Sequence, residues 1–235
     1  MSLLLGSGKE KPQILSTSVS FSGIEFEVVI NDVSNNHYIW LHGDERTANM
    51  ALRYHLNHYN GTAFLIKSDE REGVYQNTKI DPNRIFSRSG SLRALKKFRP
   101  KWAPGTLNEA LDELDQNREQ FLTILFPDSE GILIAVHNNF RGYNLKSELE
   151  ICTKVSVNPK ENPRDFIICT DPDDFDKLSV GHYNILLQDQ PPKEDDGSLS
   201  WAAFRNGIRY VNIETRLGWL SQQKKMLEFI EEHLN

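Results

Sequence analysis

Short apolar runs separated by helical patterns are the feature that most constrains the fold of this chain. Several of these runs are unbroken rather than alternating with polar residues, which predicts strands covered on both faces. They are rich in β-branched and aromatic residues and are bounded by Asn, Asp, Gly or Pro. The predicted strands are Glu25–Ile30, Tyr38–Leu41, Gly61–Ile66, Gly131–His137, Phe166–Cys169, Asn184–Leu187 and Arg209–Ile213.

Apolar residues at helical spacing fill three stretches between or after these strands. The spacing predicts helices over Thr47–Tyr59, Thr106–Phe121 and Leu217–Leu234. Thr106 followed by Glu109 predicts a capping box at the start of the second helix. Because strands alternate with helices, we expect an α/β fold with a mixed, mostly parallel sheet and helices on both faces.

The length of 235 residues fits a single domain over residues 1–235, in which we expect residues 1–20 to form an extended N-terminal segment. A net charge of −6 argues against a nucleic-acid partner or a broad surface for anionic membranes, although it allows a local basic pocket. Two cysteines exclude a disulfide framework and indicate buried thiols rather than a single bridge.

No stretch approaches the roughly 20 consecutive apolar residues that a membrane-spanning helix needs, so we expect no integral membrane segment. The N-terminal apolar run is short and lacks a basic region before it, so it does not resemble an intact signal peptide. We therefore expect a soluble protein, cytoplasmic by default. An exported form whose signal has been removed is the alternative.

His42 and Glu45 stand where a predicted strand gives way to a helical pattern. Ligands of doubly wound sheets bind at the carboxyl ends of strands, so both side chains can turn toward one point there. Imidazole nitrogens and carboxylate oxygens are suitable zinc ligands. The alternative is an acidic helix start beside an incidental histidine.

Asn83 and Arg84 lie in the turn-like segment Asp81-Pro82-Asn83-Arg84-Ile85-Phe86. The planar guanidinium of arginine matches a carboxylate with two hydrogen bonds, and a neighbouring amide adds a donor. The pair can therefore hold a carboxylate of a substrate. The alternative is an ordinary surface turn with a solvated arginine.

His137 ends one strand-like run, and Glu214 follows another. By itself, a histidine in this position is more often structural, and a glutamate is more often a helix cap or a solvated group. A carboxylate beside a metal-bound water can instead act as a general base.

Taken in order, His42-x-x-Glu45, Asn83-Arg84, His137 and Glu214 resemble the zinc carboxypeptidase superfamily, especially its succinylglutamate desuccinylase and aspartoacylase-like branch. The segment His-Gly-Asp-Glu is similar to that branch's His-Gly-Asn-Glu, and Asp-Pro-Asn-Arg-Ile-Phe is similar to its Asp-Leu-Asn-Arg-x-Phe. The helix after Glu214, with Gln222, Gln223 and Met226, is similar to the closing helix of the family. The resemblance spans about residues 38–230 and implies a zinc carboxypeptidase-like fold.

The resemblance also implies roles for these residues. His42, Glu45 and His137 would be the ligands of Zn²⁺, Asn83 and Arg84 would bind a substrate carboxylate, and Glu214 would be the catalytic general base. The family usually has a further arginine upstream of its Asn-Arg pair, and residues 74–79 contain none. Arg71 and Arg141 are the candidates to replace it. The candidates for a tyrosine that assists the general base are Tyr143, Tyr183 and Tyr210.

We therefore expect a zinc metallohydrolase of the carboxypeptidase or amino-acid deacylase type. Its substrate would be a small molecule or peptide in which an amide bond lies near a carboxylate. One alternative is a catalytically inactive binding protein that keeps the fold. Another is a hydrolase of cell-wall peptides in an exported compartment.

Overall fold

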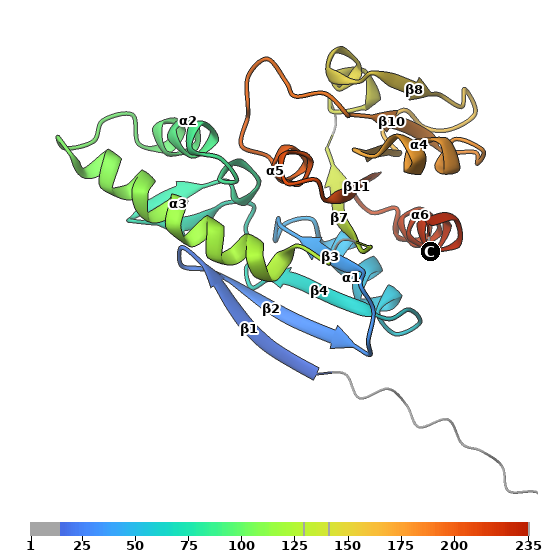
Figure 1. The fold of residues 1–235 in the computed structure, drawn as a ribbon, viewed down its shortest axis with the longest axis horizontal. Helices are drawn as coiled ribbons and strands as arrows, with labels where there is room; N and C mark the ends of the chain where they lie inside the picture. The colour runs from blue at the N-terminus through green and yellow to red at the C-terminus, as the bar shows by residue number, and fades with distance from the viewer. Residues whose placement is uncertain (1–14, 129, 141, 235) are drawn as a thin grey trace, which may run out of the picture.

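A nine-stranded sheet runs through the computed structural model, which describes residues 15–128, 130–140 and 142–234 (Figure 1). Its strand order is β1-β2-β4-β3-β7-β11-β9-β10-β8. The strands are β1 (Leu15–Phe21), β2 (Ile24–Asn31), β3 (His37–Trp40), β4 (Gly61–Ile66), β7 (Ile132–Asn139), β8 (Lys154–Ser156), β9 (Phe166–Cys169), β10 (Asn184–Leu187) and β11 (Arg209–Arg216). A separate hairpin pairs β5 (Gly73–Tyr75) with β6 (Thr78–Ile80).

The centre of the sheet is parallel. Strands β4, β3, β7 and β11 pair in parallel, as do β9 and β10, whereas β1, β2, β8 and the β9–β11 junction pair antiparallel. Every residue of β7 is buried, as its unbroken apolar run predicts for a strand covered on both faces. The predicted α/β architecture with a mixed sheet is confirmed.

Helices cover both faces of the sheet. Tyr38 of β3 contacts His55 and Glu231, which belong to α1 (Arg46–His55) and α6 (Leu220–Leu234). The neighbouring His37 points the other way, and its Nδ1 lies 2.7 Å from the carbonyl oxygen of Leu125 in α3 (Thr106–Leu125). Because successive side chains of a strand point to opposite faces, α1 and α6 lie on one face and α3 on the other.

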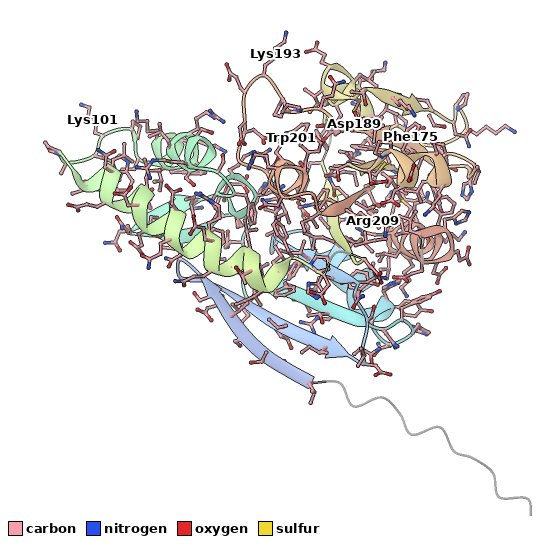
Figure 2. All side chains as sticks on the ribbon, in the orientation of Figure 1. Lys101, Phe175, Asp189, Lys193, Trp201 and Arg209 are labelled. Atoms are coloured by element: carbon pink, nitrogen blue, oxygen red, sulfur yellow. The ribbon has the colours of Figure 1, made fainter. Side chains whose placement is uncertain are left out.

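The remaining helices lie in the segments between the strands. They are α2 (Arg88–Phe98), α4 (Pro172–Leu178), α5 (Leu199–Arg205) and the short 3₁₀ helices η1 (Pro82–Arg84), η2 (Leu145–Ser147) and η3 (Leu149–Ile151). Helix α5 contacts β11 and lies between the α2–α3 end of the molecule and the end that carries β8 and α4 (Figure 1). Figure 2 shows Trp201 of α5 in this central position.

All predicted strands and helices are present. β4, β9 and β10 have the predicted bounds, and the ends of the others are shifted. Both β7 and β11 continue beyond their predicted ends. His137 therefore lies within β7 rather than at its end, and Glu214 lies within β11 rather than after it. The predicted capping box is wrong. Gly105 is the N-cap of α3, and the Thr106 hydroxyl donates instead to the carbonyl oxygen of Ala103.

Residues 15–20 belong to β1, and residues 1–14 lie outside the described part of the chain. The single domain over residues 1–235 stays a prediction. Cys169 is a buried free thiol and Cys152 a partly buried one, so neither forms a disulfide. Among the described residues, no helix combines the length and the apolar character that crossing a membrane requires.

Candidate metal centre and adjoining cavity

The first two predicted ligands lie at the junction of β3 and α1. His42 follows the end of β3, and Glu45 is the N-cap residue of α1. The Glu45 side chain does not cap its own helix, because its carboxylate turns back so that Oε1 lies 2.9 Å from Nδ1 of His42. The first turn of α1 is bound by Asn138 instead, whose side-chain Oδ1 accepts a hydrogen bond of 2.8 Å from the amide of Ala48.

His137 of β7 completes this cluster. Its Nδ1 lies 3.0 Å from Oε2 of Glu45, so the carboxylate bridges the two histidines. One ligand atom from each of His42, Glu45 and His137 lies within 4.8 Å of the others, and all three side chains are buried. Nε2 of His137 is buried and has no hydrogen-bond partner among the described residues.

Asp81 fixes the second nitrogen of His42. Its Oδ1 lies 2.9 Å from Nε2 of His42 and also accepts a hydrogen bond from the amide of Asn83. Burial alone would lower the pKa of His42, but the carboxylates of Glu45 and Asp81 raise that pKa to about 9. A carboxylate that orients a histidine in this manner is the usual outer partner of a metal-ligating imidazole.

Arg71 reaches the same cluster from the segment before β5. Its Nη1 lies 2.9 Å from Oε1 of Glu45. Burial would raise the pKa of the Glu45 carboxyl, but His137 and His42 hold that pKa far below its usual value. Arg71, one of the two candidates to replace the arginine that residues 74–79 lack, therefore lies at the site. The other, Arg141, lies outside the described residues.

Glu214 of β11 lies directly opposite His137 on the neighbouring parallel strand. Its side chain is 7% exposed, and burial raises the pKa of the carboxyl to about 7. Asn139 donates a hydrogen bond of 3.3 Å to Oε2, and Asn212 donates one of 3.4 Å to Oε1. A carboxyl with a pKa near neutrality suits proton transfer in both directions.

Asn83 and Arg84 belong to η1 and border the same cavity. Oδ1 of Asn83 accepts a hydrogen bond of 2.9 Å from the amide of Leu199, at the start of α5. Nη1 of Arg84 lies 3.3 Å from a carboxylate oxygen of Asp196, and both side chains are partly exposed. The segment between β10 and α5 therefore contributes to the walls of the site.

A cavity of about 350 Å³ joins these groups. All of the predicted site residues border it, as do Arg71, Tyr143 and Tyr210. Tyr183 does not border it and packs against Phe229 instead. Of the tyrosines considered as partners of the base, Tyr143 and Tyr210 thus remain.

The donor set fits a divalent metal ion. Two imidazoles and one carboxylate are the ligands of many catalytic zinc sites, which leave a further position for water or substrate. The buried donor atoms already face one another, and Asp81 orients one of the imidazoles. The structure thus contains a His-Glu-His cluster that could hold a metal ion.

Sequence reasoning missed the role of Asp81. The residue was part of the segment that carried the resemblance, but its contact with His42 depends on the approach of η1 to the end of β3. The signal that could have found it is a carboxylate two residues before Asn83, within a segment already expected at the site.

No protein-family model and no curated protein matches this chain. Three solved structures, each called a putative metallopeptidase, are similar to this chain. The one from Shewanella amazonensis SB2B has a TM-score of 0.49 and 12% identity, over 94% of this chain and 85% of that chain. The one from Shewanella baltica OS155 has a TM-score of 0.47 and 12% identity, over 93% and 86%. The one from Shewanella denitrificans OS217 has a TM-score of 0.49 and 10% identity, over 94% and 82%. At this identity the likeness concerns the fold and assigns no residue a role.

Proposed function

We propose that this protein is a zinc-dependent hydrolase that cleaves an amide bond in a small or peptide substrate bearing a carboxylate. The observation that carries the proposal is the convergence of His42, Glu45 and His137, with Glu214 beside them, at one cavity. His42, Glu45 and His137 would hold the metal. A bound zinc ion would lower the pKa of a water molecule and polarise the scissile carbonyl.

Glu214 acts as the general base. It takes a proton from the attacking water and hands it to the leaving amine as the carbon–nitrogen bond breaks. A pKa of about 7 lets the carboxyl accept and return this proton near neutral pH. Asn139 and Asn212 hold the two carboxylate oxygens in place.

Arg84 and Asn83 orient the substrate by its carboxylate. A guanidinium offers paired donors to that group, and a substrate carboxylate replaces or shares the contact that Asp196 makes. Arg71 supplies positive charge to the oxygen that becomes negative in the transition state. Its place beside Glu45 supports this role.

The absence of an arginine from residues 74–79 favours the alternative of a non-catalytic binding protein. The position of Arg71 at the cavity weakens this argument. The test is hydrolysis of N-acyl amino acids and short peptides by the zinc-loaded protein, compared with Glu214→Gln. Turnover that the substitution abolishes supports the proposal, whereas metal-loaded protein that turns over none of these substrates contradicts it.

A further inference from the structure

Glu148 is a cavity-lining carboxylate that the proposed chemistry does not use. Of the other carboxylates bordering the cavity, Glu45 contacts both histidines and Arg71, Asp196 pairs with Arg84, and Glu214 is the proposed base. Glu148 is partly buried and forms no ion pair with a basic side chain in the described part of the chain. Among the described residues, its carboxylate therefore borders the cavity without a salt bridge.

Two neutral donors hold this carboxylate in a fixed orientation. The hydroxyl of Tyr143 donates to Oε1 at 2.6 Å, and Nε2 of Gln188 donates to Oε2 at 2.8 Å. Burial and the charges of Glu214 and Glu148 raise the pKa of Tyr143, which keeps the hydroxyl protonated as a donor. A carboxylate has about four acceptor positions, so both oxygens can still accept hydrogen bonds from a ligand.

The path from the base to Glu148 crosses three strands. Asn212 lies two residues before Glu214 on the same face of β11, and Ile168 of β9 is its cross-strand partner. Gln188 follows the last residue of β10, the next strand beyond β9. Neighbouring strands lie about 4.8 Å apart, so this side of the cavity extends roughly 10 Å from β11.

The lining changes character along this path. Ile168 and Ile151 give this side of the cavity apolar walls, and Gln188 and Glu148 border the same cavity. Oδ1 of Asn212, a buried acceptor on the cavity side, has no hydrogen-bond partner among the described residues. Apolar walls beside a carboxylate that forms no salt bridge with a described residue match an alkyl chain with a cationic end.

We propose that Glu148, held by Tyr143 and Gln188, forms a specificity subsite for a primary ammonium or guanidinium group at the end of the substrate's side chain. This inference rests on the proposed function and names its substrate class, which is an amide whose carboxylate-bearing residue has a basic side chain. The carboxylate of that residue binds Arg84, its alkyl chain runs past Ile168, and its cation binds Glu148.

The experiment compares acylated dipeptides that end in lysine, norleucine or Nε-acetyllysine, which differ chiefly at the terminal cation. We expect the zinc-loaded protein to prefer lysine by about tenfold or more in kcat/KM, because hydrogen bonds to charged groups are stronger than those between neutral groups. Glu148→Gln abolishes this preference. Glu148→Lys reverses the preference toward peptides that end in glutamate.

Glu150→Gln is the matched control, because it removes the same charge from an exposed position of η3 that does not border the cavity. It retains the preference for lysine. Equal turnover of the three peptides by the unaltered protein, or a lysine preference that survives in Glu148→Gln, overturns the subsite.

Binding of the free amino acids separates this inference from the proposed function. Calorimetry with lysine and norleucine on metal-free protein needs no turnover. If no peptide is hydrolysed, the proposed function fails, yet tighter binding of lysine that is lost in Glu148→Gln supports the subsite. Equal binding of the two amino acids overturns it.

Discussion

Glu214 and His137 are direct neighbours on adjacent parallel strands, β11 and β7. Their side chains point to the same face of the sheet because opposed residues of paired strands share a face. A proposed base and a proposed metal ligand are therefore held in a fixed relation by the hydrogen-bond ladder of the central sheet. The segment after β3 positions His42 and η1 positions Arg84, whereas the hydrogen bonds between β7 and β11 hold Glu214 and His137 opposite each other.

We predict that Glu214→Gln retains zinc and loses at least about a hundredfold in kcat, because general base catalysis contributes 10²–10⁴-fold. The amide has nearly the same volume as the carboxyl but accepts no proton. Metal analysis and steady-state kinetics check both statements. Turnover close to that of the unaltered protein would show that another group is the base.

The same substitution is expected to stabilise the metal-free protein at alkaline pH. The pKa of Glu214 is about 7 in the folded state, against an ordinary value of 4.5. As the pH rises from 4.5 through 7, ionisation of this carboxyl therefore lowers the free energy of unfolding of the unaltered protein. Glu214→Gln removes this loss. The gain in free energy of unfolding that the substitution gives should therefore be about 2–3 kcal/mol larger at pH 8 than at pH 4.5. Denaturant unfolding at both pH values measures the difference, and an equal effect at both would contradict it.

Asp81→Asn should weaken zinc binding by about 10- to 100-fold without removing a ligand. The carboxylate fixes Nε2 of His42 and thereby the orientation of Nδ1 toward Glu45. Competition with a chromogenic chelator measures the affinity. Asp112→Asn, an exposed carboxylate on α3 away from the cavity, is the control and should leave the affinity unchanged.

The affinity for zinc should rise with pH up to about pH 9. In the metal-free protein the pKa of His42 is about 9, above its ordinary value of 6.5. Zinc must displace one proton from this imidazole, so the affinity falls by up to about tenfold per unit below pH 9. By the same linkage, the stability that protonated His42 gives the metal-free protein is fully present below pH 6.5 and lost as the pH rises through about 9. An affinity that stays constant between pH 6 and 8 would contradict this coupling.

Arg84→Ala should raise KM for carboxylate substrates by about tenfold to a hundredfold, because a hydrogen-bonded charge pair is lost. Substrates in which a carboxamide replaces that carboxylate should be affected little. Arg93→Ala removes an exposed positive charge from the neighbouring helix α2 and serves as the control. An equal rise in KM for the carboxylate and the carboxamide substrates would show that Arg84 does not bind the carboxylate.

The sequence predicts the central strands well because their apolar runs are unbroken. It does not predict β1, whose exposed serines lack an apolar run, or α2, whose sequence begins with Arg88-Ser89-Gly90-Ser91. That helix depends on Ser87, whose hydroxyl accepts a hydrogen bond from the amide of Gly90, and on packing against α3.

Within the site, sequence motifs predict the candidate ligands. The contacts of Asp81, Arg71 and Glu148, however, join segments that are distant in the sequence and lie close together only in the folded protein. Arg71 and Glu45 are 26 residues apart, and Gln188 and Glu148 are 40 apart. Their partners cannot be inferred from local spacing, because no periodicity connects them.

Metal stoichiometry tests the central claim most directly. Protein purified without chelator and supplied with zinc should bind one zinc ion per chain, and His42→Ala and His137→Ala should each lose it while remaining folded by circular dichroism. His58→Ala, a substitution at an exposed histidine near the end of α1, should retain the metal. Stoichiometric zinc that persists in both His42→Ala and His137→Ala would contradict the assignment of this metal centre.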